Sequence, residues 1–168
     1  MKIGLLSDTH GHVDSGILSA LEYVDEIWHA GDFGNHHVVD TLQKIAPLKG
    51  VYGNIDDTNI RAEFPEYLTL ELENFKCLMI HIGGKPGKYS VIGKKLIQEY
   101  RPQIFICGHS HILKIIKDHA NHCWYFNPGA AGHHGFHIQR TLIRFELNDS
   151  KISNLEVVEL GKRGKIFQ

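Results

Sequence analysis

The fold is indicated first by the stretch K-I-G-L-L-S-D-T-H-G-H, which occupies positions 2–12 of this 168-residue chain. Positions 3–6 are apolar, and polar residues follow directly from Asp8 onward. A short apolar run that ends in this way is typical of a buried strand in a parallel sheet. The stretch therefore predicts a strand that delivers Asp8 and His10 to the edge of a sheet.

Working outward, the next segments repeat this strand pattern with helices between them. Asp14 or Ser15 can cap a helix with an apolar face, and Asn35 can cap another that ends before Pro47. Strands are predicted at residues 25–30 and 48–52. Alternation of strand and helix at this spacing predicts right-handed crossovers and a parallel sheet.

Beyond residue 56 the pattern changes to strands with a single helix, which is predicted near residues 89–100. The sequence has no internal repeat or linker, so we expect one α/β domain over residues 1–168, with a flexible tail at about 161–168. The strands predicted in this part are residues 67–71, 76–80, 103–107, 112–118, 122–126, 140–148 and 152–159.

Composition excludes several classes of protein. Eighteen Lys and Arg against 19 Asp and Glu give a net charge of −1, so nucleic acid is not indicated as a partner. Apolar runs are too short to span a membrane, and no signal peptide is recognisable. The three cysteines show no C-x-x-C spacing, which argues against a disulfide framework and favours a cytoplasmic setting. Thirteen histidines are the one unusual feature.

Polar residues stand at the ends of five predicted strands, and those ends meet at one edge of an α/β sheet. Residues two apart in an extended segment point the same way, and a preceding glycine lets the backbone approach a ligand. Each motif alone also fits an ordinary turn or a structural histidine, but their conjunction favours a functional site. The motifs are Asp8-x-His10, Gly31-Asp32, Gly53-Asn54, His81 and Gly108-His109-Ser110-His111.

These motifs offer two carboxylates, one carboxamide and four imidazoles. This is more than one tetrahedral zinc accepts, and it suits two divalent metal ions that share a bridging carboxylate. Nitrogen and oxygen ligands without thiolate favour Mn²⁺ as our first expectation, with Fe, Zn²⁺ or Ni²⁺ as alternatives. Two such ions and two aspartates would leave about two positive charges in the cleft, a field that suits a phosphate ester.

In this order the motifs resemble those of the calcineurin-like metallophosphoesterases, and Asn127-Pro128-Gly129 is similar to a segment of their small, single-domain phosphodiesterase branch in bacteria and archaea. The resemblance implies a four-layer α/β/β/α sandwich with a dinuclear metal site at the carboxyl ends of the strands. It also implies that Asp32 bridges the two ions. The first ion would take Asp8, His10, Asp32 and His111, and the second Asp32, Asn54, His81 and His109.

The chain departs from this family at two positions. Many relatives have a proton-donating histidine directly after the asparagine, where this chain has Ile55. In addition, Ile82 and the residues after it replace a His-Gly-His motif, of which only the ligand His81 remains. The candidates to reach the substrate instead are His12, His133, His134 and His137, with Lys85 and Arg140 as candidate phosphate clamps.

The leading hypothesis is a metal-dependent phosphodiesterase that acts on a small phosphate ester by in-line attack of a hydroxide held between the two metals. Asn54 would stabilise charge, Asp56 would orient the Asn54 loop, and His12 is the third catalytic candidate. Two alternatives remain. One is a protein-interaction scaffold of the same fold, as in the retromer small subunit, and the other is a metal-buffering protein. A homodimer is the default expectation for a soluble oligomer.

Overall fold

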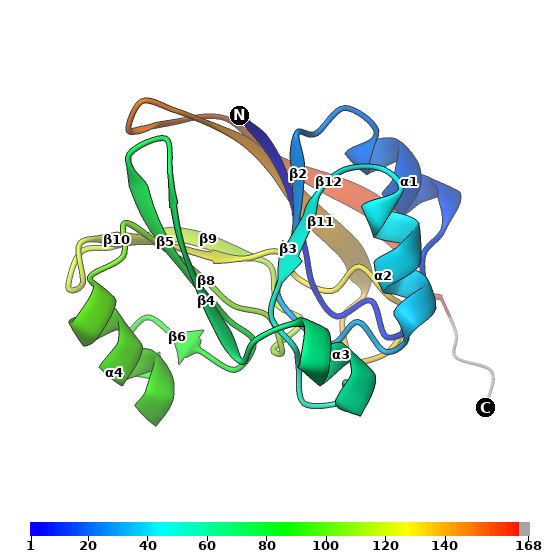
Figure 1. Ribbon diagram of the computed structural model, residues 1–168, viewed down its shortest axis with the longest axis horizontal. Coiled ribbons are helices and arrows are strands. Elements are labelled where there is room, and N and C mark those ends of the chain that lie inside the picture. Colours follow the sequence, from blue (N-terminus) through cyan, green and yellow to red (C-terminus); the bar gives the residue numbers. More distant parts are fainter. Residues whose placement is uncertain (165–168) are drawn as a thin grey trace.

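The computed structural model describes residues 1–164 and contains two five-stranded sheets that face each other (Figure 1). The first sheet has the strand order β12-β11-β1-β2-β3 and the second has the order β4-β5-β8-β10-β9. The strands of the first sheet are β1 (Lys2–Leu6), β2 (Glu26–His29), β3 (Leu48–Gly50), β11 (Gln139–Asn148) and β12 (Lys151–Lys162). Those of the second are β4 (Tyr67–Leu72), β5 (Phe75–Ile80), β8 (Ile104–Ile106), β9 (Lys114–Asp118) and β10 (Cys123–Asn127).

The parallel pairing predicted for the first strands is confirmed, and the second sheet also has a parallel core that the sequence did not predict, although both sheets are mixed. Strands β1, β2 and β3 pair in parallel, and β11 adds to β1 antiparallel. In the second sheet β5, β8 and β10 pair in parallel, with β4 and β9 antiparallel at the edges. The carboxyl ends of the parallel strands are therefore brought together, as the ligand hypothesis requires.

Alternation of side chains along the strands creates the layers. Ile3 and Leu5 of β1 point into the core between the sheets, where they join Met79 of β5. Leu6 points outward and packs with the first two helices, whereas Leu78 points outward on the second sheet toward the last helix. The predicted four-layer α/β/β/α sandwich is thus confirmed.

All four helices among the described residues begin at a capping residue. Asp14 caps α1 (Ser15–Leu21) and Asn35 caps α2 (His36–Gln43), as predicted, and Ser90 caps α4 (Val91–Tyr100). A fourth helix, α3 (Thr58–Glu63), was not predicted, because six residues are too few for a periodic apolar face. Its signal is Asp57, whose carboxylate accepts hydrogen bonds from the backbone of the first turn.

The predicted tail needs a correction. Residues 161 and 162 belong to β12, because this antiparallel ladder continues to the pair of Lys162 with Gln139 of β11. Residues 165–168 of the predicted tail lie outside the described residues.

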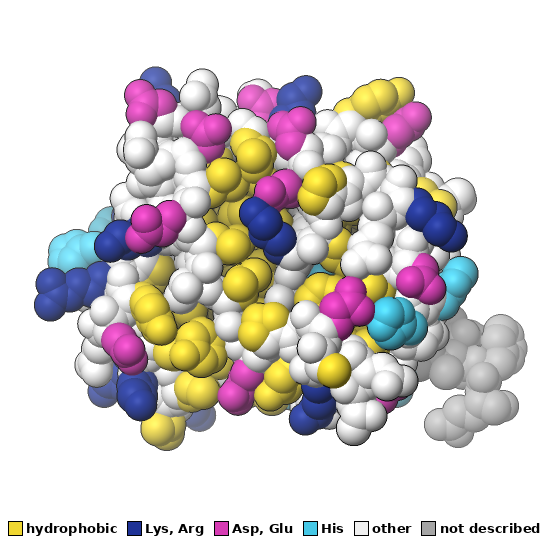
Figure 2. All heavy atoms as spheres, in the orientation of Figure 1, with side chains coloured by type: hydrophobic (Ala, Val, Ile, Leu, Met, Phe, Trp, Pro, Cys, Tyr) yellow, Lys and Arg dark blue, Asp and Glu magenta, His cyan; other side chains and the backbone are white. Residues whose placement is uncertain are grey.

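Two further features bear on the site and the surface. The glycine-rich loop after β5 contains a small hairpin of β6 (Gly84–Lys85) and β7 (Lys88–Tyr89). Figure 2 shows hydrophobic side chains gathered in the middle of the face toward the viewer, over the region where the two sheets meet. Leu68 and Leu70 of edge strand β4 are only half-buried. The three cysteines are free and buried. In residues 1–164 we find no helix long and apolar enough to cross a membrane.

Candidate metal centre

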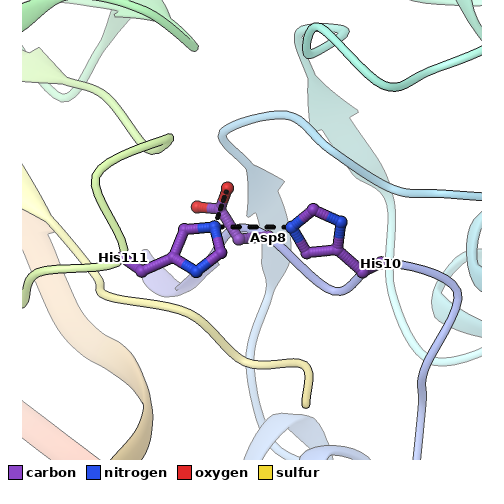
Figure 3. Close-up of side chains that lie close together, drawn as sticks. All are labelled: Asp8, His10 and His111. Atoms are coloured by element: carbon purple, nitrogen blue, oxygen red, sulfur yellow. Dashed lines mark hydrogen bonds and ion pairs between the residues drawn. The ribbon is translucent and has the colours of Figure 1, made fainter. Parts of the chain in front are cut away.

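The polar residues predicted to meet at the strand ends do lie together, in two groups. The first group is Asp8, His10 and His111, whose side chains converge in Figure 3. The Nε2 atom of His111 lies 3.2 Å from Oδ1 of Asp8 and 3.4 Å from Nε2 of His10. Asp8 and His10 follow β1, whereas His111 comes from the loop after β8, so the group joins the two sheets.

The second group is Asp32, His81 and His109. Nε2 of His81 lies 3.3 Å from Oδ1 of Asp32 and 3.1 Å from Oδ1 of Asn54. The other oxygen of Asp32 lies 3.7 Å from Nε2 of His10, a member of the first group. Asp32 thus stands between the groups, at the position expected of a bridging carboxylate.

The two groups have the chemistry of a cation site. Oδ1 of Asp8 is buried and has no hydrogen-bond partner among the described residues, while its Oδ2 accepts a hydrogen bond from the backbone of His109. A buried carboxylate oxygen without a partner is costly unless a cation compensates its charge. The two groups together bring four imidazole rings and two carboxylates to one place, and these residues fit two divalent metal ions.

Hydrogen bonds to backbone carbonyls fix which ring nitrogens face the centre. Nδ1 of His81 lies 2.7 Å from the carbonyl oxygen of Ala30, so that nitrogen carries the proton and Nε2 is free to bind a cation. Nε2 of His137 donates to the carbonyl oxygen of Gly132, which leaves its Nδ1 to accept from Nδ1 of His111 at 3.3 Å. Nε2 of His111 then presents a lone pair toward Asp8, as metal-binding histidines with such partners do.

The backbone is strained at the ligand positions. Left-handed backbone costs a residue with a side chain about 1–3 kcal/mol, and such outliers cluster at functional sites. Five of the seven predicted ligands adopt it, since each chain turns sharply as it leaves its strand. They are Asp8 (φ 55°), His10 (φ 47°), Asp32 (φ 59°), His109 (φ 64°) and His111 (φ 57°).

Two glycines provide the close approach that the sequence predicted. A Cβ atom at Gly53 would collide with the backbone and carboxylate of Asp32, and one at Gly108 would lie 2.9 Å from Oδ2 of Asp8. A side chain at either position would push the Asn54 or His109 segment away from its aspartate. Glycine at these positions therefore lets separate strand ends share one centre.

Electrostatics in the centre couples Asp32 to His81. Burial alone would raise the pKa of Asp32, but the hydrogen bond and charge of His81, together with the Ile55 backbone N–H and His10, outweigh burial and lower that pKa. Burial alone would lower the pKa of His81, but its hydrogen bond to Asp32, the charges of Asp8 and Asp32 and its hydrogen bond to Ala30 together outweigh burial and raise that pKa. A proton between these groups occupies the place of a cation, so protons and metal compete. Burial lowers the pKa of His10 and of His109, which favours the neutral, ligating rings.

Asp56 lies where an orienting residue was predicted. It is buried, and its carboxylate accepts 2.8 Å hydrogen bonds from the backbone of Gly34 and of Gly53. Arg61 of α3 adds bonds that the sequence did not indicate, donating to the carbonyl oxygens of Asp56 at 2.7 Å and of Asn54 at 3.1 Å. Together they hold the loop that carries Asn54 next to the loop that carries Asp32.

The remaining histidine candidates separate in the structure. His12 does not join either group but lies against His133, with Nε2 atoms 3.0 Å apart, and 3.1 Å from Oδ2 of Asp14. Arg140 is corrected as a phosphate clamp: it is buried, and its guanidinium donates to Asp14 at 2.8 Å. The charge of Arg140 thereby neutralises the carboxylate of Asp14, beside His12 and His133.

Of the four histidine candidates, His134 and His137 border the cleft, and His134 is the one not engaged with a ligand. Its ring centroid lies 4.8 Å from that of His10, and it borders a cavity of about 480 Å³ together with Ile55 and Phe136. His137 also borders this cavity but is engaged with His111, as described above. Lys85 lies beside a different cavity. The spacing of the three histidines after residue 132 gives no signal that separates these roles.

Comparisons with known proteins agree with this geometry. A family model described as the calcineurin-like phosphoesterase superfamily domain matches residues 1–150. A protein of Methanothermobacter thermautotrophicus named as a probable metallophosphoesterase is 30% identical over 116 residues, which cover 66% of this chain and 67% of that one.

Solved structures share the fold. One of an archaeal phosphodiesterase superposes with a TM-score of 0.72 at 22% identity and covers 95% of this chain and 99% of its own. Vps29 of Chaetomium thermophilum superposes with a TM-score of 0.76 at 12% identity, with 95% of each chain covered. At these identities the likeness shows the fold alone.

Proposed function

The chain belongs to the calcineurin-like phosphoesterase superfamily, and from this premise we propose that it is a dinuclear-metal phosphodiesterase that hydrolyses a small phosphate ester. The observation that carries the proposal is the position of Asp32 between two groups of ligands, beside the unsatisfied oxygen of Asp8. A single-metal protein would not need both groups.

Asp8, His10, Asp32 and His111 would hold the first ion, and Asp32, Asn54, His81 and His109 the second. When bound, two divalent ions supply Lewis-acid stabilisation of a phosphate and lower the pKa of coordinated water. We propose Mn²⁺ first, because the nitrogen and oxygen ligands lack thiolate.

The protein's own groups bind and orient the ester. The amide of Asn54 can offer its oxygen to a cation and an N–H to an equatorial phosphate oxygen. Asp56 and Arg61 keep that amide in place through the backbone of its loop. Ile55 borders the cleft but cannot donate a proton to the leaving oxygen. His134, beside His10, is the group we propose for that donation, and diesters with acidic leaving groups would need it least.

The test is hydrolysis of bis-p-nitrophenyl phosphate by metal-stripped protein, with and without added Mn²⁺, Zn²⁺, Ni²⁺ or Fe²⁺. Turnover should appear only with metal. Asp32→Asn should lower both turnover and bound metal, whereas Asp40→Asn, on the exposed face of α2, should change neither. Activity without metal, or an unchanged Asp32→Asn variant, would contradict the proposal.

A scaffold of the same fold is the second candidate, and one observation favours it. Apolar side chains stand exposed at the rim of the cleft, where Phe136 is fully exposed and Ile112 is 65% exposed. Such a rim is suited to a protein partner. Tight binding of two metal ions without turnover on any ester would favour this alternative.

A further inference from the structure

A second cavity, of about 500 Å³, lies directly beside the metal cleft. We call it the side cavity, and it is bounded by the β6–β7 hairpin, the start of α4 and the loop after β8. His109, Ser110 and Ile112 border both spaces, so a ligand can extend from one into the other. Its volume lies within the range of ligand-binding pockets, about 300–1,000 Å³.

The walls of the side cavity are apolar and aromatic. Ile82 and Ile112 stand at its mouth, and the rings of Tyr89 and Tyr125 lie inside. Both tyrosine hydroxyls are already engaged, because Tyr89 donates to Asp118 at 2.6 Å and Tyr125 donates to the carbonyl oxygen of Gly84 at 2.8 Å. What half-buried Tyr89 offers to a ligand is therefore ring surface, which suits a flat apolar group, whereas Tyr125, only 2% exposed, forms part of the wall.

The lysine side chains that border the side cavity make it positively charged. Lys85, Lys88 and Lys114 border it, and no acidic residue does so within the described part of the chain. The ion pairs found among residues 1–164 include none of these three lysines. Unpaired ammonium groups at the mouth of an apolar pocket favour a ligand that carries a negative charge next to its ring.

We propose that the side cavity binds one ester arm of the substrate, and that this arm is a flat ring system with its own negative charge, as in a nucleotide. This inference rests on the proposed function, since it places the scissile phosphate at the metal centre. In hydrolysis the oxygen of water forms a new bond to phosphorus, the bond from phosphorus to the leaving oxygen breaks, and one proton from water goes to that oxygen. The product that contains the side-cavity arm also keeps the phosphate that was attacked.

The test compares three p-nitrophenyl phosphodiesters whose leaving group is the same. The second arm is methyl, thymidine, or thymidine with a further phosphate on its other hydroxyl. We expect kcat/KM to rise about tenfold from methyl to thymidine through ring stacking. The further phosphate should add about fivefold, chiefly through KM, which is the size expected for an exposed ion pair.

Variants separate the two contributions. Lys88→Glu should abolish the gain from the further phosphate, and Tyr89→Leu should reduce the gain from thymidine. Lys151→Glu, an exposed lysine of the other sheet, serves as the matched control and should keep both gains. Circular dichroism checks that each variant is folded.

The outcomes distinguish the two proposals. Equal kcat/KM for all three esters, or gains that survive Lys88→Glu and Tyr89→Leu in folded protein, would overturn the side-cavity inference while the phosphodiesterase stands. No metal-dependent hydrolysis of any ester, the methyl ester included, would overturn the proposed function itself.

Discussion

His29, the last residue of β2, lies fully buried beneath the metal centre. Its Nδ1 accepts a 3.2 Å hydrogen bond from the backbone N–H of Gly31. Its Nε2 therefore carries the proton and donates a 3.0 Å hydrogen bond to the hydroxyl of Thr9. Burial lowers its pKa to about 3, and the ring stays neutral. The residue therefore fixes the turns before Asp32 and after Asp8 without entering the cleft.

This burial predicts a pH dependence of stability. The ordinary histidine pKa is 6.5, so below that value the unfolded chain takes up a proton that the folded protein excludes until about pH 3. The contribution of His29 to the free energy of unfolding is complete above pH 6.5. It should fall by about 2 kcal/mol between about pH 7 and about pH 5. Urea unfolding of metal-stripped protein measures it.

In the His29→Gln variant the unfolded chain has no imidazole at position 29 to take up this proton. Its free energy of unfolding should therefore fall less over the same pH interval. His119→Gln removes an exposed histidine and should behave like the natural sequence. An equal loss in His29→Gln and the natural sequence would show that His29 is not the group responsible.

Replacing Ile55 by histidine is predicted to improve catalysis. The side chain of Ile55 is 46% exposed at the cleft, and its contact with Asp32 is made by the backbone N–H at 3.1 Å, so the side chain can be changed without breaking that bond. In a His134→Gln protein, which lacks the proposed donor, Ile55→His should raise kcat on esters with poor leaving groups by up to about a hundredfold, with little change for p-nitrophenyl esters. Ile55→Gln is the polar control without a suitable proton, and an equal gain there would contradict the proton-donor explanation.

At the scale of elements, α3 explains how a short loop becomes a ligand platform. Asp57 caps the helix, and the helix aims Arg61 back at the loop between β3 and α3. The guanidinium also lies 4.7 Å from the centre of the Tyr52 ring, which fixes its direction. Asn54 is therefore held by a helix that carries no ligand itself.

Arg61→Met should loosen the Asn54 loop and lower metal affinity about tenfold, because partners that orient ligands typically contribute 10–100-fold. Equilibrium dialysis with Mn²⁺ measures the affinity, and circular dichroism checks the fold. Lys44→Met, at the exposed end of α2, is the control cation and should bind metal normally. Unchanged affinity in Arg61→Met would mean that Asp56 alone holds the loop.

For the whole molecule, each candidate group draws ligands from both sheets. Asp8 and Asp32 follow strands of the first sheet, whereas His81, His109 and His111 follow strands of the second. Metal ions would therefore tie the sheets together at one edge, while the shared apolar core joins them elsewhere. We propose that residues 1–168 unfold as a single domain, and that metal stabilises both sheets together.

Two tryptophans can test this proposal, since Trp28 lies in β2 and Trp124 lies in β10 of the other sheet. In Trp28→Phe and in Trp124→Phe, fluorescence reports one sheet at a time and circular dichroism reports the whole. Thermal midpoints from the two probes should coincide in each variant and rise together when metal is added. Separate midpoints, or a rise confined to one probe, would indicate two units.

The sequence alone determined the strand pattern, the two predicted helix caps and the residues that end the strands, because these depend on local periodicity and side-chain chemistry. The family resemblance already implied that His10 and His111 share an ion, but only the tertiary structure showed their contact, that His134 and not His12 lines the cleft, and that α3 exists. Those outcomes depend on how two sheets pack and on hydrogen bonds between residues about a hundred positions apart. No local pattern encodes such distances, and the side cavity likewise exists only where the hairpin, α4 and the His109 loop meet.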